Sequence, residues 1–147
     1  MMKFLYVLIY LAIPVTIYSY NLGQTVNPGI KIGYEFGANH CWVIGAEISY
    51  VVFNKNFFYG GPIVGITKRI SKTGNFVPYC EFEAGWGPLG LALGIELDKK
   101  ALVRHRVFAG GLLYCSYKWT MDTKDGELSG ILKYYGFIKL PNGWDLM

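Results

Sequence analysis

The sequence is short of charge. Only 16% of its 147 residues are Asp, Glu, Lys or Arg, whereas a soluble domain carries about 25%. The basic residues give a net charge of +4 and are scattered along the chain. Nucleic-acid binding needs basic residues gathered on one face or stripe. We therefore expect no nucleic-acid partner, and a chain that presents few charged groups to water.

Cysteine and histidine are also scarce. Cys41, Cys80 and Cys115 are odd in number and far apart, which fits neither a disulfide framework nor a structural zinc site. His40 and His105 are the only histidines, and both are predicted to lie at strand ends. Neither has a nucleophile and a carboxylate beside it in the sequence, as a hydrolytic site requires. We expect no metal, no cofactor and no catalytic site.

The sequence was searched for two enzyme motifs, and neither indicates an active site. Residues 85–90 match G-x-G-x-x-G, but the nucleotide-binding motif requires a helix to begin there, and this segment continues with the period-2 alternation of a strand. The G-x-S-x-G elbow of lipid hydrolases is absent. A convergence of His105 with Ser116 or Ser129 in space is the remaining route to a lipid-modifying enzyme.

Residues 1–19 are predicted to be a signal peptide. Lys3 supplies the positive start, residues 4–18 are apolar, and Ser19 is a small residue before the cut. The alternative is an uncleaved anchor, but a membrane-spanning helix needs about 20 apolar residues and this run is shorter. The mature chain, residues 20–147, is then one domain.

The mature sequence alternates apolar residues with small or polar ones, and turn signals recur at short intervals. Such alternation predicts strands, and regularly spaced turns predict a sandwich or barrel. Abundant Gly and aromatic residues also disfavour helices. Pro62 makes the third strand irregular. We count seven strands, at residues 30–36, 42–52, 57–69, 76–86, 89–97, 104–119 and 129–140.

The less apolar face decides between a soluble and a membrane barrel. In residues 89–97 the leucines and Ile95 share one face, while Gly90, Ala92, Gly94 and Glu96 share the other. The side chains on that second face are too small, and too few of them are charged, for a surface that meets water. They suit the interior of a narrow barrel. The apolar face then meets lipid, and such alternation over about 9–11 residues is typical of transmembrane strands. We predict an all-β, small antiparallel up-and-down barrel of about eight strands.

Charged residues on the lumen face are the candidate functional residues. Buried charges persist only when they are paired, so acids and bases in similar numbers are expected to form a network. The structural interpretation is a plug that fills the lumen, which we favour, and the functional alternative is an ion pathway. The predicted network comprises Glu35, Glu47, Glu81, Glu83, Glu96, Lys31, Arg69, Arg106 and Lys133.

These features carry a resemblance. The export signal, the opening at 27–34, the Gly-x-Glu repeats at 33–35, 45–47 and 94–96, and residues 130–134 resemble small, mostly uncharacterised outer-membrane β-barrel proteins of Gram-negative bacteria. These are built like the OmpA and OmpX barrels and are porin-family-like. The resemblance implies location in the outer membrane, with membrane lipids as partners, and transfers no functional residue.

The chain departs from this family in two respects. Closed bacterial barrels have an even number of strands, so we expect either an eighth strand in residues 21–29 or 137–147 or a chain that does not close in this way. The chain also ends at Met147 without the terminal aromatic of such barrels.

Two alternatives from other classes stay open. One is a soluble, periplasmic or secreted lipocalin-like barrel, which would turn its apolar face inward to bind an apolar ligand. The other is the outer-membrane lipid-modifying enzyme.

Overall fold

The computed structural model describes residues 23–37, 40–54, 56–71, 74–111, 113–120, 125–134 and 138–139. The predicted signal peptide, residues 1–19, lies outside these ranges and stays a prediction, as does the start of the mature chain. Within the described ranges, no helix is long and apolar enough to cross a membrane.

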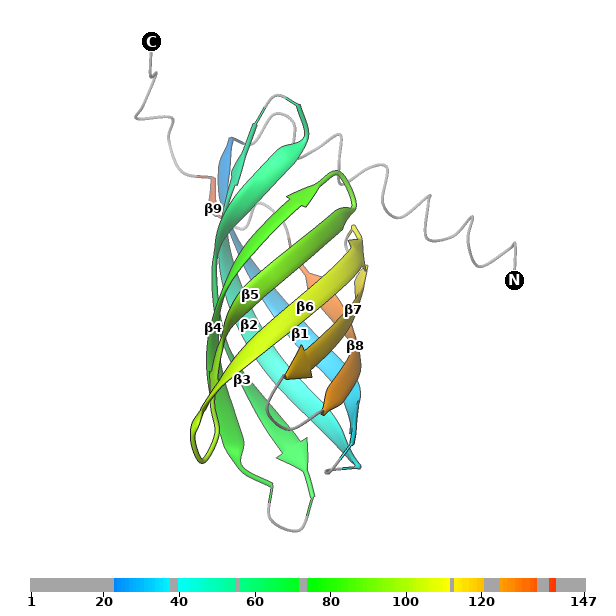
Figure 1. Cartoon of the computed structure of the whole chain (residues 1–147). Coiled ribbons are helices and arrows are strands. Elements are labelled where there is room, and N and C mark those ends of the chain that lie inside the picture. Colours follow the sequence, from blue (N-terminus) through cyan, green and yellow to red (C-terminus); the bar gives the residue numbers. More distant parts are fainter. Residues whose placement is uncertain are drawn as a thin grey trace, which may run out of the picture.

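The described residues form a closed antiparallel β-barrel (Figure 1). Eight long strands follow one another around the barrel, and β1 closes it by pairing with both β2 and β8. This confirms the predicted fold class. The strands are β1 (Gln24–Phe36), β2 (Cys41–Phe53), β3 (Phe58–Ile70), β4 (Phe76–Trp86), β5 (Leu89–Leu97), β6 (Ala101–Gly110), β7 (Leu113–Thr120) and β8 (Gly126–Lys133), followed by the two-residue β9 (Ile138–Lys139).

The eighth strand comes from a place that the sequence analysis did not predict. The single strand expected at 104–119 is two strands, β6, which ends at Gly110, and β7, which begins at Leu113. Gly110 has a φ of 146°, which glycine adopts without a Cβ penalty. The expectation of an eighth strand in 21–29 or 137–147 is therefore wrong. Residues 24–29 begin β1, and the described part of 137–147 is β9.

β9 pairs with β1 on the same side as β8 does. The β1–β8 ladder ends at Gly29↔Lys133, and the β1–β9 ladder begins at Val26↔Ile138. Pro28, which has no N–H to give to a ladder, lies between the two ladders on β1. The backbone N–H of Tyr134 donates to the Pro28 carbonyl at 2.9 Å.

Pro62 does not interrupt β3, but it interrupts the ladder beside it. β2 and β3 pair at Ser49↔Ile63 and again at Val52↔Gly60, with no pairs between. The missing N–H of Pro62 accounts for that gap. The strand itself runs on to Ile70 and pairs with β4 throughout.

The two ends of the barrel differ in their connections. One end, the turn end, carries the connections 54–57, 87–88 and 111–112, the start of β1 and the end of β8. The opposite end, the loop end, carries the connections 37–40, 71–75, 98–100 and 121–125. In Figure 1 the turn end is at the top.

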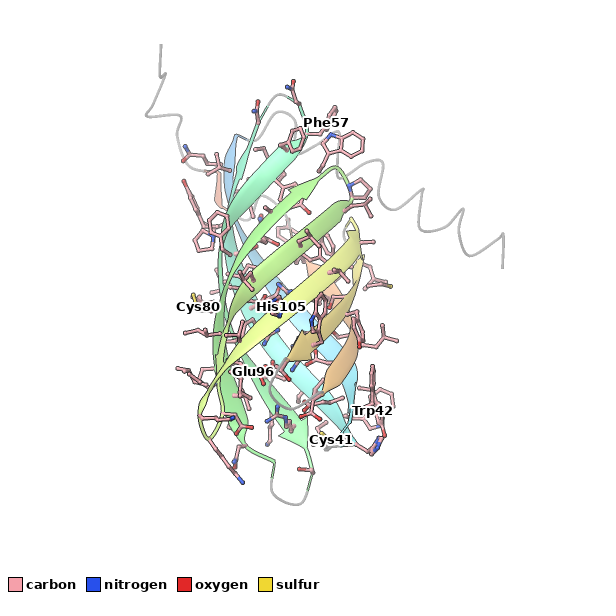
Figure 2. All side chains as sticks on the ribbon, viewed as in Figure 1. Cys41, Trp42, Phe57, Cys80, Glu96 and His105 are labelled. Carbon is pink, nitrogen blue, oxygen red and sulfur yellow. The ribbon has the colours of Figure 1, made fainter. Side chains whose placement is uncertain are left out.

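Alternation along every long strand separates two faces, as predicted. Leu91 is 64% exposed and Glu96 is 2% exposed, although both lie on β5. Figure 2 shows Cys80 pointing away from the barrel and Glu96 pointing into it. The outward face is apolar, and the inward face carries the charges.

Candidate functional site

The lumen holds a large cluster of charged side chains. All six glutamates of the sequence face inward and are at most 2% exposed. All three arginines also contribute to it, at positions 69, 104 and 106. Successive side chains of a strand point to opposite faces. These charged residues occupy the positions that point inward, together with every second residue of their strands.

Glu47 is the centre of the cluster on the side toward the turn end. Its carboxylate is 2.8 Å from Nη1 of Arg106 and 3.2 Å from Nζ of Lys133, and it accepts a hydrogen bond of 2.8 Å from the hydroxyl of Tyr79. Lys133 also lies 3.0 Å from Glu83. Glu47 lies on β2, and its partners thus come from three other strands, namely β4, β6 and β8.

Arg106 and Arg104 link this centre to the next one through Glu81. Nη2 of Arg106 is 2.7 Å from Glu81, and Nε of Arg104 pairs with the other oxygen of the same carboxylate. Arg104 also reaches Glu96, at 3.4 Å. Arg104 and Arg106 lie two residues apart on β6. Through them, Glu81 on β4 is connected with Glu96 on β5.

Glu96 is the centre toward the loop end. Besides Arg104, it contacts Nζ of Lys118 at 3.1 Å and Nη2 of Arg69 at 3.3 Å. Arg69 also pairs with Glu35 at 2.8 Å and with Asp98 at 2.6 Å. One guanidinium thus holds three carboxylates at the loop end of the lumen.

The last branch runs through Glu127. Lys118 lies 3.3 Å from one oxygen of Glu127, and Lys31 lies 2.9 Å from the other. Lys31 and Glu127 are each 1% exposed in their side chains. This branch joins β1 and β8, the two strands that close the barrel, to the rest of the cluster.

These pairs form one continuous network, here called the lumen network. Six glutamates face six bases inside the barrel, so their formal charges cancel, and Asp98 adds one acid at the loop end. An acid and a base inside a protein persist when each is paired and hydrogen-bonded. The network comprises Glu35, Glu47, Glu81, Glu83, Glu96, Asp98, Glu127, Lys31, Arg69, Arg104, Arg106, Lys118 and Lys133.

The structure places all nine residues of the sequence-based set in this network. Eight of them contact one another directly, and Lys31 joins through Glu127. Four further members, Arg104, Lys118, Glu127 and Asp98, were not predicted from the sequence. Arg104 has the same parity as Arg106, so strict use of the alternation finds it.

Tyr79 and the lumen glycines explain how long side chains fit in a narrow barrel. The guanidinium carbon of Arg104 lies 3.9 Å from the centre of the Tyr79 ring, and Nζ of Lys31 lies 5.2 Å from it. A Cβ at Gly65 would collide with that ring. Glycine is therefore required where the ring and two cations share the lumen.

Apolar residues close the lumen beyond the charges. Near the turn end, Phe108 and Tyr114 pack edge to face at 5.4 Å, with Ala92 and Ile131 against them. Within the described residues, the interior is thus filled from the aromatic cluster to Arg69. An eight-stranded barrel has an interior just wide enough for side chains to fill.

The histidines do not form a hydrolytic site with the candidate serines. His105 is inside β6 rather than at a strand end, and its ring stacks outward on Trp119 at 5.2 Å. Ser116 and Ser129 face inward and hydrogen-bond to each other at 2.8 Å. The two groups lie on opposite faces of the barrel wall. His40 directly precedes β2, as predicted.

The segment 85–90 is a hairpin and not a nucleotide-binding turn. β4 ends at Trp86, residues 87–88 form the turn, and β5 begins at Leu89. Across the described ranges, no group of three His, Cys, Asp or Glu side chains is arranged to hold a metal ion.

No family model and no curated protein matches the chain.

Proposed function

We propose that this protein is an outer-membrane β-barrel of a Gram-negative bacterium, with a structural or binding role, no catalysis, and a lumen closed by the lumen network. One observation carries the proposal: the apolar side chains face outward and the charged side chains face inward. A soluble barrel distributes them the other way, because its outer face must meet water.

The outward face supports contact with lipid. Each of the eight long strands exposes large apolar side chains, and Leu91, Ile30 and Phe76 are each more than 60% exposed. Soluble monomers rarely expose contiguous apolar patches larger than a few hundred Å². A lipocalin-like barrel, the soluble alternative, would need its apolar side chains inside, around a ligand.

The height of the apolar surface also suits a membrane. On β2 the outward residues run from Trp42 to Val52. Ten residues at about 3.3 Å each span about 33 Å along the strand, and a tilt of about 40° reduces this to about 25 Å along the barrel axis. Outer-membrane barrels have an apolar band about 25 Å tall, with aromatic residues at both edges. Here Trp42 lies at the loop end and Trp86 at the turn end.

The connections suggest an orientation. Outer-membrane barrels have short periplasmic turns and longer extracellular loops. The turn end, with its two-residue connection at 87–88, then faces the periplasm, and the loop end faces the cell exterior.

The lumen network supports a closed interior in preference to an ion pathway. Formal charges inside the barrel balance, and every base contacts at least one carboxylate. Moving an ion through would require several buried pairs to separate, and breaking one costs about 3–5 kcal/mol.

Fractionation tests the proposal. The protein should appear in outer membranes, migrate faster on a gel when unheated than when boiled, and have an intact mass that starts near Tyr20. Recovery in a soluble fraction without detergent would reject the membrane placement and favour the lipocalin-like barrel. Retention of Met1 in the exported protein would reject the signal-peptide prediction alone.

A further inference from the structure

Two adjacent residues of β3 have opposite electrostatic surroundings. Arg69 faces the lumen and holds three carboxylates. Lys68 is exposed on the outer face, and its Nζ lies 5.1 Å from the centre of the Phe76 ring. Within the described residues, no carboxylate pairs with Lys68. Its positive charge therefore has no counter-ion among them.

Lys68 lies among aromatic and apolar side chains at the loop end. The register places it between Ile44 on β2 and Phe76 on β4. Two residues further along β3, on the same face, Ile70 pairs with Trp42, and both are more than half exposed. In outer-membrane barrels, such aromatic residues mark the depth of the lipid headgroups. The ammonium group of Lys68 thus lies at the level of the aromatic residues at the loop end.

A second lysine lies at the same end of the barrel. Lys99 is exposed after the end of β5, and the described residues provide no carboxylate for it either. The ladder between β4 and β5 ends at Tyr79 and Glu96, and Lys99 follows three residues later, in the connection 98–100. The neighbouring Asp98 does not neutralise Lys99, because its carboxylate is 2.6 Å from Arg69.

We propose that Lys68, Phe76 and Lys99, here called the loop-end lysine surface, bind the anionic phosphate headgroup of a membrane lipid. The inference rests on the proposed membrane placement. Two exposed lysines lie at the loop end without a counter-ion among the described residues, and one of them packs over an aromatic ring beside apolar side chains that acyl chains would cover. A lipid with a net negative phosphate complements both the lysines and the apolar side chains. Each lysine near an anionic membrane surface strengthens binding about fivefold.

Tryptophan quenching in vesicles tests this surface. Trp42 lies beside it, and Trp86 lies at the opposite end of the barrel. A variant that keeps Trp42 alone is made with Trp86→Phe, Trp119→Phe and Trp144→Phe, and a matching variant keeps Trp86 alone. The full mature chain is refolded into phosphatidylcholine vesicles that contain increasing fractions of either brominated phosphatidylglycerol or brominated phosphatidylcholine. Both lipids occupy both leaflets, so the result does not depend on the direction of insertion.

We expect brominated phosphatidylglycerol to associate near Trp42 at least fivefold more strongly than brominated phosphatidylcholine, with no such preference near Trp86. The preference should disappear when Lys68→Gln and Lys99→Gln are combined. It should persist when Lys68→Arg and Lys99→Arg are combined, because the charge is kept.

Three results would overturn the inference. Equal quenching of Trp42 by the two lipids would show that the surface does not select an anionic headgroup. An equal preference at Trp42 and Trp86 would show attraction to the whole protein and not to this surface. If neither lipid quenches either tryptophan, the membrane placement itself fails, and the inference fails with it.

Discussion

Replacing Glu127 by Gln should destabilise the barrel strongly. The carboxylate of Glu127 is 2.9 Å from Nζ of Lys31 and 3.3 Å from Nζ of Lys118. Lys118 keeps a second carboxylate, because Glu96 lies 3.1 Å away. Lys31 has no other carboxylate partner among the described residues. The substitution therefore leaves one buried ammonium group without a counter-ion.

The structure sets the size of the effect. Glutamine has nearly the volume of glutamate, so no cavity is added to the lost charge. Leaving a buried charge without its partner costs about 3–5 kcal/mol of unfolding free energy. Glu96→Gln should cost less, although more than the limit of about 0.5 kcal/mol for a surface change. Each of its three bases keeps another carboxylate, namely Glu35 for Arg69, Glu81 for Arg104 and Glu127 for Lys118.

Urea titrations of the refolded barrel in lipid vesicles measure this difference. Adding Lys31→Met to Glu127→Gln is the matched control, since it removes the unpaired charge and should recover much of the lost stability. An unfolding free energy for Glu127→Gln within about 0.5 kcal/mol of the parent would refute the reasoning. It would mean that this pair contributes nothing to holding the lumen closed.

Further predictions concern the same titrations. Glu47→Gln should lower the unfolding free energy by more than about 0.5 kcal/mol, since three donors meet that carboxylate, and an unchanged midpoint would contradict this. Leu93→Arg should cost about 2–4 kcal/mol near the bilayer midplane and Leu97→Arg, at the end of the same strand, about 0–1; equal costs would argue against lipid contact. Gly94→Ala should impair folding because its methyl group would collide with the backbone of β4, whereas Gly130→Ala should be tolerated, since the nearest atom to a Cβ there would be 3.9 Å away; equal folding yields would contradict the packing.

Alternation allowed most of the barrel to be predicted from the sequence. Both faces of residues 89–97 were predicted because five apolar side chains alternate there with Gly, Ala and Glu. The division between β6 and β7 was missed because both strands have inward residues of the same parity. Alternation therefore continues across the turn, and the turn signal of the dipeptide Gly110-Gly111 was outweighed by it.

The missed members of the lumen network have a related cause. Glu127 falls between the predicted strands 104–119 and 129–140, although it shares its parity with Lys133 at the other end of β8. Asp98 directly follows the predicted strand 89–97, although it has the same parity as Glu96. Charged residues near turns resemble loop residues in sequence, so their inward direction is visible only once the pairing of strands is known.

Which carboxylate pairs with which base could not be predicted. Glu47 meets Arg106 of β6 and Lys133 of β8 across the lumen. Such contacts depend on the closure and stagger of the barrel, which the alternation of single strands does not contain. The outward stacking of His105 on Trp119 has the same origin, because it joins two strands across the turn at Gly110.

The most direct test of the central claim measures what surrounds the outer wall. Cys80 lies in β4, is exposed on the outward face, and pairs with Val64 and Ile95. With Cys41→Ala and Cys115→Ala, it is the only cysteine, and a nitroxide label on it reports the surrounding medium in vesicles. The account predicts that oxygen, which concentrates in lipid, relaxes this label far more strongly than a water-soluble nickel chelate. A label relaxed mainly by the chelate would show that the apolar wall faces water, and would contradict the membrane barrel.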